Sequence, residues 1–138
     1  MARTGMIRRE EGLALVELTL VIMLLVLLTF GVMEYGWMFF RVQQVCSAAR
    51  EGVRDAIVPD ATVADVQATI TSLMTSWGMG GSGYTVDISP SNIADLEPGE
   101  PVSVTVQVPY SNIHLLGMPV IPTPETLRSR VVMAKEGP

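Results

Sequence analysis

The side chain with the clearest chemical potential is Glu17, a single acid inside a long apolar stretch. Residues 13–33 contain no other charged residue. A helix rises about 1.5 Å per residue, so this stretch would be about 30 Å long, which matches the hydrocarbon core of a bilayer. Because lipid offers no water, an unpaired carboxylate there is unfavourable and indicates a functional partner. The stretch therefore predicts a membrane-spanning helix whose acid needs a cation.

Proteolysis of the chain itself could supply that cation. If a peptidase cut the bond between Gly12 and Leu13, the new amino group of Leu13 would lie four residues before Glu17, on the same helix face. The carboxylate could then pair with this amine, or with the amine of a neighbouring copy offset along a fibre. Such a pair is much stronger in a low dielectric than on a surface. The alternative is a Glu that snorkels to the interface or is protonated.

The other reactive side chains give weaker signals. Cys46 and His114 are the single cysteine and the single histidine, which excludes a disulfide within the chain and argues against a His/Cys metal site. No nucleophile–base pair or ligand cluster stands out, so we expect no enzyme activity, no cofactor and no small-molecule substrate. Cys46 would either be buried as a small apolar side chain or form an intermolecular disulfide. The net charge of −5 argues against a nucleic-acid partner.

The residues before the apolar stretch predict its orientation. Arg3, Arg8 and Arg9 precede it, and such a basic bias keeps the flanking segment cytoplasmic. A cleavable secretory signal would have a shorter apolar region and a small-residue cleavage site, and no such site follows Met33. We therefore predict a cytoplasmic leader at residues 1–12, a single span at residues 13–33, and an extracytoplasmic remainder.

The long helix should continue beyond the membrane. Apolar residues recur at helical spacing as far as Ile57, and Pro59 ends the pattern. We therefore predict one helix over residues 13–58, whose first half lies in lipid.

Residues 59–138 should form a small extracytoplasmic domain. Thr62 and Asp65 have the spacing of a capping box at the start of a second helix. Alternating patterns near residues 84–88, 102–108 and 127–136 predict three strands. The predicted fold class is α+β, with a small three-stranded antiparallel sheet packed on the two helices.

The loop at residues 111–124 combines large apolar side chains with three prolines, which argue against a regular helix or a central strand. Such a loop either folds onto the core or forms a contact surface for another subunit or the membrane. We take Ile113, Leu115 and Leu116, together with Cys46, as possible intermolecular contacts.

Three stretches resemble known families. Residues 12–17, Gly-Leu-Ala-Leu-Val-Glu, followed by the apolar run resemble the type IV pilin class, whose prepilin peptidase cuts after such a Gly and whose members carry Glu at the fifth mature position. Residues 9–17 also resemble the opening of the TadE-like proteins. Residues 48–56, Ala-Ala-Arg-Glu-Gly-Val-Arg-Asp-Ala, resemble the helix signature of that family.

The resemblance implies a pilin-like minor subunit, or pseudopilin, of a tight-adherence (Flp, type IVc) pilus or a related secretion machine. It implies cleavage between Gly12 and Leu13, and pairing of Glu17 with a neighbour's mature N-terminus. Expected partners are other pilins and pseudopilins, the prepilin peptidase, an inner-membrane pilus assembly platform and membrane lipid. The expected location is the bacterial inner membrane. A single-pass binding module that never polymerises, and a major fibre subunit, remain as alternatives.

Overall fold

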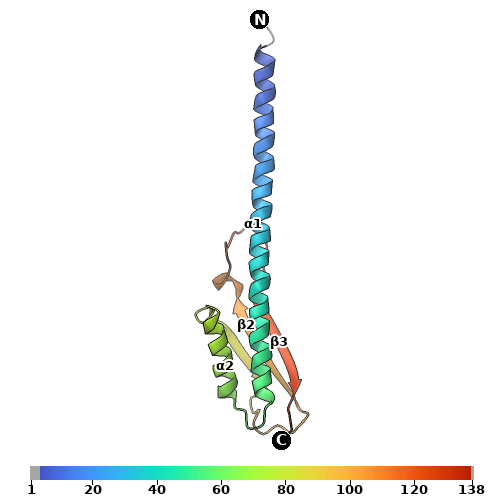
Figure 1. The fold of residues 1–138 in the computed structure, drawn as a ribbon, viewed down its shortest axis with the longest axis vertical. Helices are drawn as coiled ribbons and strands as arrows, with labels where there is room; N and C mark the ends of the chain where they lie inside the picture. The colour runs from blue at the N-terminus through green and yellow to red at the C-terminus, as the bar shows by residue number, and fades with distance from the viewer. Residues whose placement is uncertain (1–3, 138) are drawn as a thin grey trace.

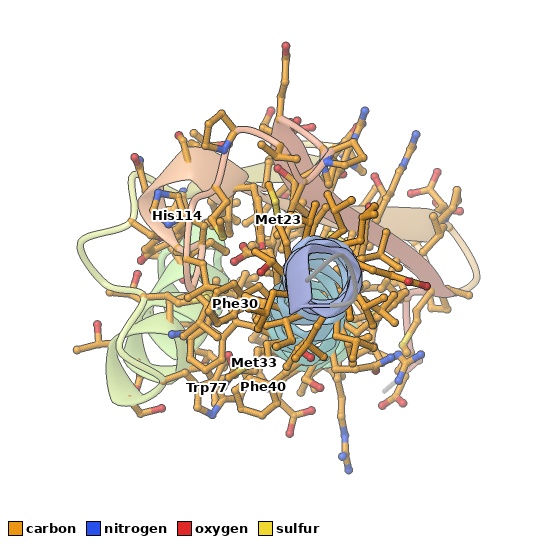
Figure 2. All side chains as sticks on the ribbon, turned by 90° about the horizontal axis from the view of Figure 1, so that it is seen from above. Met23, Phe30, Met33, Phe40, Trp77 and His114 are labelled. Carbon is orange, nitrogen blue, oxygen red and sulfur yellow. The ribbon has the colours of Figure 1, made fainter. Side chains whose placement is uncertain are left out.

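The computed structural model describes the backbone of residues 4–137 and the side chains of residues 12–137. A long helix, α1 (Thr4–Ile57), projects from a small domain made of α2 (Val63–Ser76) and a three-stranded sheet (Figure 1). Figure 2 looks down α1 from its N-terminal end, with α2 and the sheet arranged around it. Arg3 lies outside the described residues, and so do the side chains of Arg8 and Arg9. The arrangement confirms the predicted α+β fold.

α1 begins earlier than the predicted start at residue 13. It runs without a break from Thr4 through the Gly12–Leu13 peptide. Its apolar first half, from Leu13 to Met33, is exposed at every residue except Gly31, which is half-buried. α1 is long and apolar enough to be a candidate membrane span. None of its most apolar stretch is buried within the protein. Such a surface suits lipid rather than water.

The second half of α1 packs on the domain through its smallest residues. Ala48, Ala49 and Ala56 are fully buried. A Cβ added at Gly52 would lie 2.6 Å from Ile70 Cδ1 and 2.8 Å from Ile70 Cγ1 of α2, so glycine lets the two helices approach without displacing this buried side chain. The Ala- and Gly-rich signature of residues 48–56 is therefore a close-packing surface for α2 and the sheet.

The end of α1 is fixed by the C-terminus of the chain. Lys135 Nζ donates to Ala56 O at 3.2 Å and to Val58 O at 2.8 Å, while Glu136 N donates to Ile57 O at 3.0 Å. These donors satisfy carbonyls that a helix end leaves free, and the ammonium suits the negative end of the helix dipole.

α2 confirms the predicted capping box. Thr62 is its N-cap, its hydroxyl accepts from Asp65 N, and the Asp65 carboxylate accepts from Thr62 N. The buried residues of α2 are Val66, Ile70 and Met74, one turn apart, so the helix turns one apolar face to the core.

The sheet has the order β1-β2-β3 and is antiparallel throughout. Its strands are β1 (Thr85–Ser89), β2 (Pro101–Pro109) and β3 (Thr126–Ala134). The alternate valines of β2 are fully buried and form the centre of the core with the helices: Val102, Val104, Val106 and Val108. A short 3-10 helix, η1 (Tyr110–Asn112), leaves β2 and starts the apolar loop.

Candidate functional site

The predicted processing and pairing residues share one exposed region of α1. Gly12, Leu13 and Glu17 are all exposed, and Leu13 and Glu17 lie one turn apart. Within the described residues 12–137, no hydrogen bond or ion pair reaches the Glu17 carboxylate. A single described chain therefore presents this acid outward from an apolar helix surface.

The two hydroxyl groups in the same stretch, unlike the Glu17 carboxylate, are hydrogen-bonded within the helix. Thr19 Oγ1 donates to Leu15 O at 2.8 Å, and Thr29 Oγ1 donates to Leu25 O at 2.7 Å. Each threonine thus satisfies its donor one turn back along its own helix, which makes it compatible with lipid. The Glu17 carboxylate has no such hydrogen bond among the described residues 12–137, so it is the one charged group on the otherwise apolar stretch of residues 13–33.

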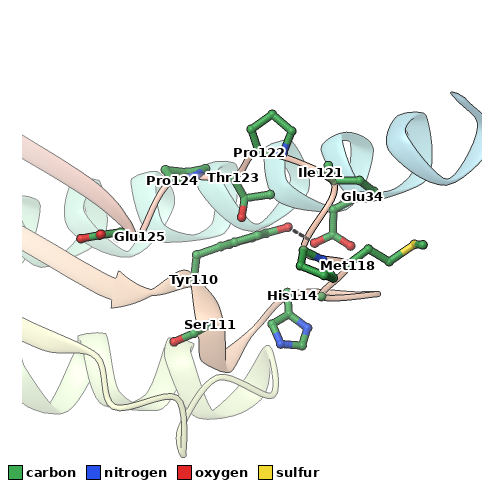
Figure 3. A pocket seen from close by; sticks show the side chains of 12 residues that line it. Glu34, Tyr110, Ser111, His114, Met118, Ile121, Pro122, Thr123, Pro124 and Glu125 are labelled. Atoms are coloured by element: carbon green, nitrogen blue, oxygen red, sulfur yellow. Dashed lines mark hydrogen bonds between the residues drawn. The ribbon is translucent and has the colours of Figure 1, made fainter. Parts of the chain in front are cut away.

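A second acid, Glu34, forms a site that the sequence analysis missed. It follows the predicted span directly, and only 1% of its surface is exposed. Tyr110 Oη donates to Glu34 Oε1 at 2.5 Å (Figure 3). The backbone N–H groups of Leu115 and Leu116 donate to the same carboxylate at 3.4 and 2.8 Å. The sequence does contain a signal for this site. Glu34 directly follows an apolar run and has no basic residue within one helical turn that could pair with it.

The environment of Glu34 favours its charged form. Burial alone would raise the pKa of this carboxyl, but the hydrogen bonds from Tyr110, Leu116 and Leu115 outweigh burial and lower the pKa below the ordinary value. Burial and the neighbouring carboxylate of Glu34 raise the pKa of Tyr110 well above its usual range. At neutral pH the lowered pKa of Glu34 favours a charged acceptor, and the raised pKa of Tyr110 favours a protonated donor.

Two aromatic residues next to Glu34 hold the same loop. Tyr35 Oη donates to Pro122 O at 2.8 Å, and Trp37 Nε1 donates to Ile113 O at 2.7 Å. Together with Glu34, they tie both arms of the 111–124 loop to α1. Tyr35 and Trp37 are thus attachment points of the loop on α1, just beyond the predicted span.

The loop is partly folded onto the core and partly free. Ile113 and Ile121 are buried in their own chain, so Ile113 is not available as the intermolecular contact that we predicted. Leu115 and Leu116 remain 44% and 39% exposed, and Val120 is 66% exposed. The prediction that Leu115 and Leu116 contact another molecule stays open.

Cys46 and His114, the single cysteine and the single histidine, lie in different parts of the structure. Cys46 is half-buried, and Ser129 Oγ of β3 donates to its sulfur at 3.4 Å. His114 is exposed and lines a cavity of about 520 Å³ with Glu34 and Tyr110 (Figure 3). Among the described residues, no three His, Cys, Asp or Glu side chains gather as a metal site would require.

Comparison with known proteins bears on α1. The model of a family described as TadE-like protein matches residues 12–54. These residues include the apolar stretch, Glu17, Glu34 and most of the small-residue packing surface. The match confirms the resemblance to the TadE-like family and covers residues 12–17 and 48–54 of the two stretches from which it was inferred. No curated protein and no solved structure matches the chain.

Proposed function

From the TadE-like match of residues 12–54, we propose that this chain is a minor pilin-like subunit, or pseudopilin, of a tight-adherence pilus or a related secretion machine. The match supports a pilus-associated, pilin-like protein, and α1 is a candidate span for anchoring it in a membrane. The subunit role, the processing and the pairing described below are the finer parts of the proposal.

The mechanism begins with insertion. α1 enters the inner membrane with its basic leader in the cytoplasm, and the α+β domain lies on the other side. The role is structural rather than catalytic. Prepilin peptidase cuts between Gly12 and Leu13, which creates a positive amino group at the end of the span.

Glu17 then sets the axial offset between neighbouring subunits. A neighbouring subunit of a growing fibre brings its own mature amine to this carboxylate, and the pair forms in a medium where either charge alone is unfavourable. Subunits that enter at another offset leave both charges unpaired. The observation that carries the proposal is the exposed Glu17, one turn from Leu13 in the matched stretch and without a hydrogen bond or ion pair among the described residues 12–137.

The test is replacement of the acid at constant size. Glu17→Gln should insert normally and should be lost from the sheared pilus fraction, and cells that carry it should adhere less. Glu51→Gln is the matched control, because Glu51 is an exposed acid on the part of α1 beyond the span. Normal pilus assembly and adhesion in the Glu17→Gln strain would refute the pairing.

Native cross-linking separates this function from the alternatives. A pilin-like subunit should give a ladder of cross-links through residues 13–33, because its spans meet in the assembly. A binding module that never polymerises would give no ladder. A major fibre subunit would give the ladder and would also dominate the mass of the purified pilus.

A further inference from the structure

We propose that residues 115–122 form a second membrane-inserted element beside α1, and that the groove between them holds an acyl chain of a lipid in that leaflet. This rests on the proposed function only in taking residues 13–33 as a membrane span. It adds a lipid site to the domain side of the protein.

The loop lies beside residues of the predicted span. Loop and helix enclose an apolar groove of about 430 Å³, with Val120, Ile121 and Pro122 on one side. The helix side includes Leu24 and Leu28, which belong to the predicted span. Figure 1 shows the segment between η1 and β3 running up beside α1, beyond the sheet.

The length of the span makes this depth decisive. If lipid stopped at the far edge of the groove, only residues 13–23 would remain in the membrane, about 16 Å of helix. That is roughly half of a hydrocarbon core of about 30 Å. A span of ordinary length therefore immerses the loop.

The surface of the loop suits lipid. Residues 115–122 contain no charged side chain. Leu115, Leu116 and Val120 turn large apolar surface outward although they lie in a loop. In water this surface would be an unfavourable patch, whereas in the hydrocarbon region it has no such penalty.

Several polar backbone groups of the loop are hydrogen-bonded within the protein. Irregular backbone persists at membrane depth only where the protein satisfies or shields its polar groups. Glu34 accepts from Leu115 N and Leu116 N, and Tyr35 donates to Pro122 O. Ile121 N donates to Met118 O at 3.1 Å, and Pro119 and Pro122 have no N–H to satisfy. The Glu34 carboxylate thus replaces water as the acceptor for two backbone N–H groups of the loop.

The size of the groove favours an acyl chain over a helix of a second copy. A helix about 10 Å wide fills roughly 400 Å³ in each turn. The groove would therefore hold one turn of such a helix, while a flexible single chain can follow its full length. The walls from Leu24 to Val32 and from Val120 to Pro122 are almost wholly apolar.

The experiment places an environment-sensitive bimane label at defined sites of the full chain. The background is Cys46→Ser, and the chain is reconstituted in phosphatidylcholine–phosphatidylglycerol vesicles. Val120→Cys tests the loop, and Met23→Cys reports on the span. Val132→Cys is the matched control, because Val132 is also an exposed valine, at 53%, but lies on β3. The quenchers are a nitroxide-labelled phosphatidylcholine and aqueous iodide.

Lipid-borne nitroxide should quench the Val120 label to the same extent as the Met23 label, and iodide should quench neither. The Val132 label should show the reverse. A Val120 label that behaves like Val132 would refute the inserted loop while leaving the span intact. An unquenched Met23 label would refute the anchor and the loop together.

Dilution of the protein with more of the same lipid mixture, at a constant fraction of nitroxide lipid, distinguishes the occupant of the groove. Quenching at Val120 that is unchanged on dilution supports the acyl chain. Quenching that appears only on dilution would mean that another copy had filled the groove, and would overturn the lipid site. Assembly of the Glu17→Gln variant is measured separately, so failure of the loop and failure of the pilin-like function are distinguishable.

Discussion

The phenol of Tyr110 and the carboxylate of Glu34 meet at 2.5 Å although they are 76 residues apart in the sequence. This contact joins the point where β2 ends to the point where α1 leaves the predicted span. It fixes the loop at residues 111–124 against the long helix. The domain is therefore attached to α1 both along the small-residue surface of residues 48–56 and at the end of the predicted span.

Tyr110→Phe should loosen this attachment. The change removes the donor but keeps the ring, so the buried carboxylate loses one of its hydrogen bonds, and we expect a loss of about 1–3 kcal/mol. Thermal unfolding of the detergent-solubilised chain measures it. Tyr84→Phe is the control, because Tyr84 Oη donates to Thr71 at an exposed site. Equal stability of the two variants would contradict a structural role for the Glu34 contact.

Acid should weaken the same contact. The folded-state pKa of Glu34 is depressed, so its contribution is fully present above the ordinary value of about 4.5 and is lost as pH falls through the lower folded pKa. The stability difference between wild type and Glu34→Gln should therefore shrink as the pH falls below about 4.5. Chemical unfolding across this range measures the difference. A difference that is constant with pH would show that the charge of Glu34 does not matter.

Gly52→Ala should push α1 and α2 apart. The added Cβ would meet Ile70 Cδ1 at 2.6 Å and Cγ1 at 2.8 Å, and overpacking of this kind is unfavourable by about 1–3 kcal/mol. Gly36→Ala is the control, since nothing lies within 4 Å of a Cβ added there.

Ile70→Val separates a steric effect from a backbone effect when the free energies of unfolding of the single and double variants are compared. It removes Cδ1, the nearest atom to the added methyl group. The Gly52→Ala/Ile70→Val double variant should therefore be more stable than the sum of the two single changes predicts. Strict additivity would contradict close packing as the reason for glycine at this position.

Local patterns predicted most of the fold. The apolar repeat of α1, the capping box at Thr62 and the alternation in β2 each report on neighbours within a few residues, so helix, cap and strand could be read directly. The start of α1 was placed too late, because the prediction began the helix at the expected cleavage site, whereas the helix continues through residues 4–12.

The contacts that the sequence did not reveal are those between distant segments. Glu34 finds its donors in a loop more than 75 residues away, and Lys135 reaches the end of α1 from the far end of the chain. No periodic pattern links such partners, since their meeting depends on how the sheet places β2 and β3 against α1. The loop was correctly predicted to be apolar, but only the structure shows that it lies beside the predicted span.

The mature N-terminus is the most direct test of the pilin-like mechanism. Intact-mass spectrometry of the protein from its native membrane, with sequencing of the N-terminal peptide, measures it. The mechanism predicts a chain that begins at Leu13, with the amine that Glu17 of a neighbour requires. A chain that still begins at Met1 would contradict it.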